Sequence, residues 1–169
     1  MTVSSGTSTI RLGSKRLKEM EALRVAEYVV TYCYKTGSPV TNLQLQKMLY
    51  FLWIDYYKKY NEPLFTDRRF EAWPLGPVIR DVYYRFCSFG SMTILPSIAR
   101  IENADLDLPN SKRNSIDSII KKYANRYVST LVNDSHEKGH AWDRVYQEGK
   151  GNKREISYDS IIRLECGNK

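Results

Sequence analysis

Cysteines are few in this chain, and they are not spaced as metal ligands or disulfide pairs. Cys33, Cys87 and Cys166 are spread through 169 residues, with no C-x-x-C motif. An odd number of widely spaced cysteines argues against a disulfide framework and against a zinc ribbon. None lies in a sequence context that would activate a thiol, so nucleophilic catalysis is not supported. The pattern indicates a reducing cytoplasm.

Long apolar runs and phosphate-binding loops are also missing. No stretch approaches the roughly 20 apolar residues that a membrane-spanning helix requires. The N-terminus lacks the apolar core of a signal peptide. The isolated glycines Gly76 and Gly90 do not form a glycine-rich phosphate loop. We therefore expect a cytoplasmic protein with no membrane partner and no cofactor.

Acidic residues are outnumbered by basic ones. The chain has 26 lysines and arginines against 19 aspartates and glutamates, which gives a net charge of +7. Residues 1–16 are rich in serine, threonine and glycine, a composition that predicts a disordered basic arm. Residues 17–169 are long enough to form one domain with its own core. More than half of the excess charge lies before Glu19, at Arg11, Lys15, Arg16 and Lys18.

A helix over residues 41–60 is the best-marked element of the sequence. Thr41 and Gln44 have the Thr-x-x-Gln spacing of a capping box, and Val40 and Leu45 stand at the positions of a hydrophobic staple. Apolar and aromatic residues cover more than one face of this helix. We therefore predict a central helix that is packed on several sides.

The other predicted elements are arranged around this helix. We predict a mainly α fold, a single compact helical domain around the buried central helix with a small two-stranded β element. An acidic loop is expected over residues 97–110. Before and after the central helix we expect a helix over 17–35 that Gly37 ends, and strands at 69–73 and 92–95 that pair with each other. Between these strands we expect a helix that Pro77 opens and Gly90 ends. The C-terminal third should contain a helix from about 116 that breaks near Asn125 and resumes through Leu131, a short helix at 142–147, and a last helix capped by Ser157.

Four stretches, taken in order, resemble a known family. They are residues 22–34, LQLQKMLYFLWIDYY at 43–57, PLFTDRRFEAWPLGPVIRDVYYRF at 63–86 and SHEKGHAWDRVYQEG at 135–149. Together they resemble the Panacea antitoxin domain, the SocA-like family that also includes phage-associated GepA-like proteins. The fourth stretch departs from the family pattern, because Ala141 stands where a proline commonly precedes the tryptophan.

The resemblance implies a mostly helical domain that binds a co-encoded protein toxin and neutralises it by direct contact. Members of the family act with very different toxins, so the identity of the toxin does not follow from the match. The positions that match the family motifs are expected to be structural. They are Leu45, Gln46, Lys47, Leu49, Tyr50, Phe70, Glu71, Trp73, Gly76, Pro77, Val78, His136 and Trp142.

One segment suggests a different chemistry. HEKGH at 136–140 satisfies the H-E-x-x-H motif of zinc peptidases, in which two histidines one helical turn apart bind the metal and the glutamate activates water. Gly139 opposes the regular helix that this chemistry requires, and a third ligand would have to be Glu155 or Glu165. We favour a structural role for His136, whose imidazole would hydrogen-bond to a loop carbonyl.

Basic pairs raise the question of nucleic-acid binding. No recognisable helix-turn-helix recognition helix accompanies them, so sequence-specific binding is not expected. Non-specific contact through the basic arm and attraction to an acidic toxin stay open. The pairs are Lys58-Lys59, Arg68-Arg69, Lys112-Arg113, Lys121-Lys122 and Lys153-Arg154.

A protein partner is expected where the central helix, the first strand and the third helix meet. Tyrosine and arginine are favoured as binding anchors, and five such residues are predicted to border this face: Tyr57, Arg68, Arg69, Arg80 and Tyr84. The alternative is that these five are ordinary surface residues with no role in binding. Our main hypothesis is a non-enzymatic antitoxin whose partner is a protein toxin encoded nearby. The alternatives are a proteolytic adaptor or phage-encoded interaction protein that works with a protease or chaperone, and, more remotely, the HExxH zinc peptidase.

Overall fold

Helix α2, Asn42–Tyr60, begins at the capping box that the sequence predicts. In the computed structural model, which describes residues 20–167, the Gln44 backbone amide donates to Thr41 Oγ1 at 3.2 Å. The Thr41 amide donates in return to Gln44 Oε1 at 2.9 Å. Both amides belong to the group that a helix start leaves without partners, so the box satisfies them within the protein. The capping prediction is confirmed.

Loss of this cap is expected to weaken the fold measurably. Replacing Thr41 with alanine removes the acceptor for the Gln44 amide and is expected to lower the free energy of unfolding by about 1 kcal/mol. Thr41→Ser keeps the oxygen and should retain most of the stability. Urea unfolding followed by circular dichroism measures both variants. An equal loss in the two would show that the hydroxyl is not the stabilising group.

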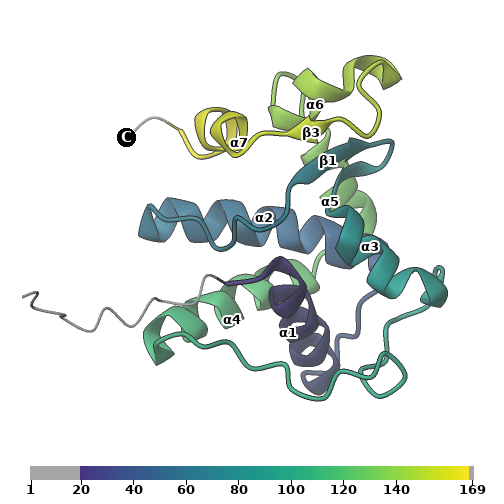
Figure 1. Cartoon of the computed structure of the whole chain (residues 1–169), viewed down its shortest axis with the longest axis vertical. Coiled ribbons are helices and arrows are strands. Elements are labelled where there is room, and N and C mark those ends of the chain that lie inside the picture. Colours follow the sequence, from purple (N-terminus) through teal and green to yellow (C-terminus); the bar gives the residue numbers. More distant parts are fainter. Residues whose placement is uncertain (1–19, 168–169) are drawn as a thin grey trace, which may run out of the picture.

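Helix α2 lies at the centre of the molecule (Figure 1). Eleven of its 19 residues are buried, far more than one amphipathic stripe would bury. On one side it contacts α1, Ala22–Lys35, and α4, Asn110–Ala124; on the other it contacts α7, Tyr158–Glu165. Two shorter helices, α5, Val128–Ser135, and α6, Ala141–Tyr146, complete the part of the chain that follows α4. The expected mainly α fold around a buried central helix is confirmed.

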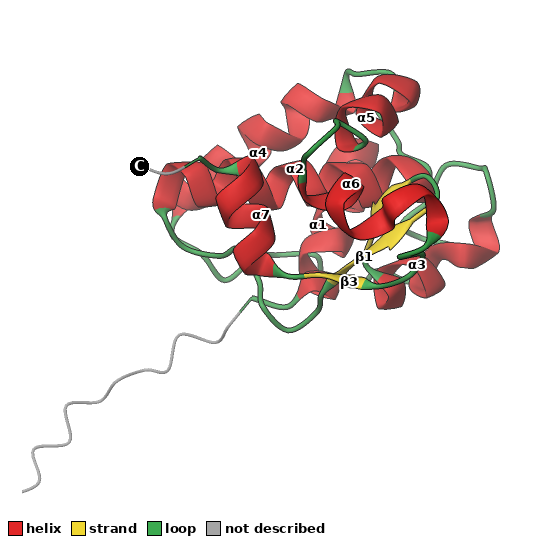
Figure 2. Cartoon of the chain, turned by 90° about the horizontal axis from the view of Figure 1, so that it is seen from above, coloured by secondary structure: helices red, strands yellow, loops and turns green. Residues whose placement is uncertain are grey.

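The sheet differs from the expected one. It is antiparallel with three strands in the order β2-β1-β3: β1 is Phe70–Trp73, β2 is Gly76–Val78 and β3 is Glu155–Ile156. The predicted strand at 92–95 is wrong, because only Thr93 forms an isolated bridge, and its partner is Thr41. A two-residue turn at Pro74 and Leu75 lets the chain return at once, so β1 finds its first partner locally. In Figures 1 and 2, β3 lies beside α6, which contacts it.

Pro77 does not open a helix as predicted. It lies in β2 and pairs with Ala72, and α3, Arg80–Phe86, begins only after Ile79. Because β2 is at the edge of the sheet, the missing amide of a proline is tolerated there. The predicted stop at Gly90 is confirmed: a short 3₁₀ helix, Cys87–Phe89, follows α3 and ends at this glycine with φ +57°.

The start of the first helix was predicted wrongly, whereas several other helix boundaries are confirmed. The first helix begins at Ala22, since Met20 and Glu21 are not helical, and residues 1–19, including the expected arm, lie outside the described part of the chain. The Ala22 amide donates to Asp67 Oδ1 at 2.9 Å, so a distant carboxylate caps α1. The break at Asn125, the left-handed Gly37 and the Ser157 cap are confirmed, the last by a 3.1 Å bond from the Ser160 amide.

Candidate protein-binding surface

Two buried motif side chains of α2, Lys47 and Gln46, attach the β1–β2 hairpin to this helix. Lys47 is fully buried, and its ammonium donates to the Pro77 carbonyl oxygen at 2.7 Å. Burial lowers the pKa of Lys47 to about 7. Gln46, also buried, accepts from the Ile79 amide at 3.0 Å and donates to Asn42 at 3.0 Å. These bonds fix where β2 ends and α3 begins.

A stack of aromatic rings closes the other side of the hairpin. The His136 and Trp142 rings are parallel within 10°, with centroids 3.9 Å apart, and Trp142 Nε1 donates to the Trp73 carbonyl oxygen at 2.8 Å. Burial lowers the pKa of His136, and the positive charge of Lys47 adds to the effect. The expected bond from His136 to a loop carbonyl is not made: among the described residues, Nε2 is buried without a partner, and the ring stacks on Trp142 instead. His136 and Trp142 therefore support the hairpin through packing.

The H-E-x-x-H segment does not form the helix that a zinc peptidase needs. His136 is the cap that follows α5, and Gly139 has φ +82°, so the two histidines do not share a helical face. His140 Nδ1 instead lies 2.7 Å from Glu165 Oε2, whose carboxylate also accepts from Tyr50 at 2.9 Å. Within residues 20–167, no group of three or more His, Cys, Asp or Glu side chains is arranged to hold a metal ion. His136 and His140 are therefore not arranged as the metal ligands of a zinc peptidase.

The outer face of the hairpin carries an ordered polar cluster. Arg80 binds Glu71 with two hydrogen bonds of 2.9 and 3.1 Å, and the same carboxylate accepts from Trp73 Nε1 at 2.8 Å. The hydrogen bond to Glu71 raises the pKa of Arg80. The Trp73 ring contacts Tyr83 with centroids 5.0 Å apart, and Lys153 Nζ lies 5.1 Å from the centroid of the same ring. The cluster joins the sheet, α3 and the loop before β3.

Two hollows flank this cluster. The apolar hollow, of about 370 Å³, lies between the start of α2, the hairpin turn and α3. The charged hollow, also of about 370 Å³, lies on the other side of the Glu71–Arg80 pair. The apolar hollow is lined by Asn42, Leu43, Gln46, Trp73, Pro74, Leu75, Val78, Tyr83, Cys87 and Gly90. The charged hollow is lined by Thr66, Asp67, Arg68, Arg69, Glu71, Ile79, Arg80, Asp81 and Glu155.

The structure brings together three of the five predicted partner residues. Arg68, Arg69 and Arg80 all line the charged hollow. Arg68 pairs with Asp81 and Arg80 with Glu71, while Arg69 lies 4.5 Å from the Tyr158 ring centroid. Their charges are therefore largely matched within the chain.

The two predicted tyrosines lie apart from these arginines. Tyr84 is 59% exposed on α3, with its ring against Tyr83 of the apolar hollow. Tyr57 lines neither hollow, and its ring stacks on Trp53 at 5.5 Å. The predicted face is thus a real meeting point of elements, but Tyr57 is not part of it.

Leu75 and Lys153 were not predicted to belong to the partner face, although Lys153 was named in a basic pair. Leu75 is 54% exposed at the tip of the hairpin turn, where polar residues are usual. An apolar residue in the Pro-Leu-Gly-Pro turn was therefore a usable signal. Lys153 reaches Trp73 only because β3 pairs with β1, which no local pattern indicates.

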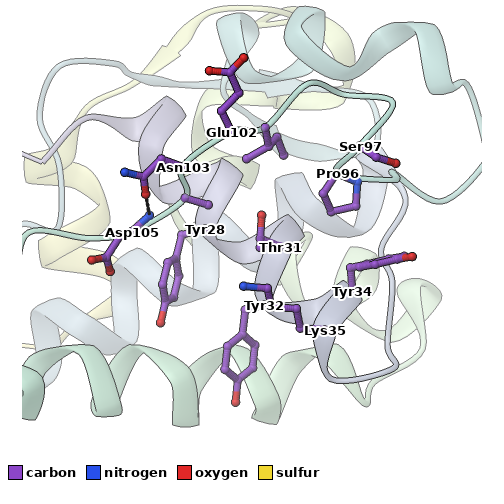
Figure 3. Close-up of a pocket in the computed structure, with 12 residues that line it drawn as sticks. Tyr28, Thr31, Tyr32, Tyr34, Lys35, Pro96, Ser97, Glu102, Asn103 and Asp105 are labelled. Atoms are coloured by element: carbon purple, nitrogen blue, oxygen red, sulfur yellow. Dashed lines mark hydrogen bonds between the residues drawn. The ribbon is translucent and has the colours of Figure 1, made fainter.

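A third hollow lies away from the motif residues. It has a volume of about 710 Å³ and lies between α1 and the loop at 96–105 (Figure 3). Figure 3 shows Tyr28 and Tyr32 extending from α1 in the same direction, while Glu102 points away from them. The Tyr28 hydroxyl donates to Asp117 at 2.5 Å, and burial with this bond raises the pKa of Tyr28. Because no motif residue lines this hollow, we favour the hairpin face.

Fold and surface together define a small, mainly α domain that presents a hollowed hairpin face. The chain belongs to the family described as antitoxin SocA-like, Panacea domain, whose model matches residues 45–143. Over 141 residues it is 28% identical to the antitoxin SocA of Caulobacter vibrioides (strain NA1000 / CB15N). The aligned region covers 79% of this chain and 74% of that protein. No solved structure matches the chain. Within residues 20–167, no helix combines the length and apolarity needed to cross a bilayer.

Proposed function

We propose that this chain is an antitoxin that binds a cognate protein toxin directly and thereby blocks it. Its membership of a SocA-like antitoxin family supports the role. The observation that carries direct binding is the hairpin face, where exposed Leu75 and Tyr84 border an apolar hollow. Exposed apolar side chains next to a preformed hollow are typical of surfaces that bind proteins. The proposal places both proteins in the cytoplasm and requires no catalytic residue.

Coexpression with the neighbouring genes tests this proposal. A gene next to this one should stop growth when expressed alone, and coexpression of this chain should restore growth. The two proteins should then purify together in a defined ratio. The proposal fails if no adjacent gene is toxic and the purified chain retains no protein partner.

The lifetime of the toxin separates blocking from delivery to a protease. An antitoxin that blocks by contact leaves the toxin level unchanged or higher, because a bound, folded partner is protected. An adaptor would shorten the toxin's half-life in a protease-dependent manner. The comparisons support a toxin partner and give no support to a protease or chaperone. We therefore expect a pulse-chase experiment to show a stable toxin.

A further inference from the structure

We infer that the apolar hollow receives one large apolar side chain of the toxin, and that Lys153 pairs with a carboxylate beside that side chain. The inference rests on the proposed function and names the part of the toxin that this surface fits. The partner segment is therefore an exposed stretch with a Leu, Met or aromatic anchor and an Asp or Glu within a few residues of it.

The walls of the hollow indicate the apolar anchor. Its lining includes Leu43, Trp73, Pro74, Val78 and Tyr83, and within residues 20–167 no Asp, Glu, Lys or Arg lines it. At about 370 Å³ it is near the lower end of ligand-pocket volumes, so it suits a side chain better than a folded element. Burial of such an anchor in a tight pocket is the usual origin of a binding hot spot.

The apolar rim extends beyond the hollow. Leu75 is 54% exposed on the hairpin turn, Tyr84 is 59% exposed on α3 and Met92 is 67% exposed shortly after it. A bound segment would cover such side chains around the anchor and exclude water from it. The rim thus offers additional apolar area around the anchor.

The floor of the hollow is held in place before any partner arrives. Asn42 Nδ2 donates to the Tyr83 carbonyl oxygen at 3.0 Å, and Gln46 bridges Asn42 and the Ile79 amide. Asn42 and Gln46 are 4% and 1% exposed, so these bonds are shielded from water. A hollow that is already ordered loses little conformational entropy on binding, which favours affinity.

The charge beside the hollow indicates a carboxylate. Lys153 Nζ lies 5.1 Å from the centroid of Trp73, which forms one wall. Within residues 20–167, Lys153 has no ion-pair partner, and the nearby Glu71 carboxylate is already bound by Arg80 and Trp73. A carboxylate on the partner would supply the missing charge, whereas a lysine or arginine there would be repelled. The net charge of +7 likewise favours a negatively charged partner over longer distances.

The test measures the affinity of this chain for the purified toxin that coexpression identifies. Leu75→Asp is expected to weaken binding at least about 30-fold, the range of a hot-spot residue. Ile98→Asp is the matched control, because Ile98 is 66% exposed but lies in the loop beside α1. It should change the affinity less than about threefold, the scale of a surface change away from the contact.

A charge reversal tests the second half of the inference. Lys153→Glu is expected to weaken binding about tenfold and to reduce its salt dependence. Lys150→Glu makes the same charge change at an exposed residue of the same loop and should have a much smaller effect. Circular dichroism of each variant checks that the fold is intact.

Four outcomes would overturn the inference. If wild-type chain binds the toxin and both Leu75→Asp and Lys153→Glu keep full affinity, the hollow is not the contact and only the proposed function survives. If Ile98→Asp weakens binding instead, the toxin contacts the loop beside α1. If wild-type chain alone forms a dimer that Leu75→Asp disrupts, a second copy of the chain is the occupant. If wild-type chain binds no toxin, the proposed function fails and the inference with it.

Discussion

Replacing Gly76 with alanine is expected to lower the free energy of unfolding by about 3 kcal/mol, from backbone strain and overpacking together. Gly76 has φ +104°, which side-chain-bearing residues rarely adopt. A Cβ atom there would lie 2.4 Å from Ser135 Oγ and 2.9 Å from Lys47 Nζ. Both neighbours are buried, so they have little room to move away. The hairpin would have to lift from α2 and α5.

Gly37→Ala is the matched control for this variant. Gly37 has φ +80°, but no atom lies within 4 Å of an added Cβ. Gly37→Ala should therefore lower the free energy of unfolding by about 1–2 kcal/mol, from backbone strain alone. Urea unfolding followed by tryptophan fluorescence measures both variants. Equal losses would contradict the close approach of Gly76 to Lys47 and Ser135.

The Gly76→Ala variant should also weaken toxin neutralisation at temperatures where it stays folded. Gly76 follows the turn that carries Leu75, and Trp73 pairs with it across the hairpin. A displaced hairpin would change the shape of the apolar hollow, so growth rescue should fall more than the loss of folded protein explains. Gly37→Ala should reduce rescue only in proportion to its folded fraction.

Short-range signals predicted the central helix and its ends well. The capping box of α2 needs only Thr41 and Gln44, which are three positions apart and whose side chains bond reciprocally whatever the rest of the chain does. The Ser157 cap and the stops at Gly37 and Gly90 depend on equally local geometry. Such features are set within one or two helical turns, so they can be read from the sequence.

The sheet could not be predicted in the same way. Phe70 pairs with Ile156, and two residues of β3 carry no strand pattern of their own. The predicted partner at 92–95 had a better local pattern than β3, but the turn at Pro74 and Leu75 makes β2 the nearer partner. Pairing between distant segments depends on the packing of α6 and α7, which local propensity does not encode.

The candidate surface, too, was predicted only where its residues are close in sequence. Arg68, Arg69 and Arg80 were expected on one face, and they do line one hollow, because the first strand and α3 are close in sequence. Their ion pairs with Asp81 and Glu71 could not be assigned without coordinates. Lys47 was placed among structural positions by family resemblance alone, since lysine is among the residues least often buried.

Replacing the buried Lys47 with methionine is expected to remove a rise in stability between pH 7 and 8.5. Burial lowers the pKa of Lys47 from 10.5 to about 7. Between these two values the unfolded chain binds more protons than the folded chain, so stability increases with pH. Over this window, the wild-type free energy of unfolding should rise by about 1–2 kcal/mol. Below pH 7 both states become protonated and the contribution to the slope disappears.

Other titrating groups limit this window. The pKa of His136 is lowered from 6.5, so the folded imidazole is neutral above pH 7. The unfolded imidazole is still partly protonated just above pH 7, which adds a small slope of the same sign that fades by about pH 8. Burial raises the pKa of Cys33 to about 12, which makes stability fall once the unfolded thiol ionises near pH 9. Tyr123 and Tyr158, with pKa values raised to about 12, act in the same direction above pH 10. In a window from 7 to 8.5 the amine of Lys47 is therefore the main source of the slope.

Lys58→Met is the control for Lys47→Met, because Lys58 is exposed on the same helix. It should keep the wild-type slope, whereas Lys47→Met should give a nearly flat profile by urea unfolding at each pH. The absolute stability of Lys47→Met reflects two opposed effects. The Pro77 carbonyl loses its donor, which costs about 1–3 kcal/mol, while the burial cost of the amine disappears. The slope is thus the decisive quantity: a profile of Lys47→Met parallel to that of the wild type would show that this amine is hydrated in the folded protein.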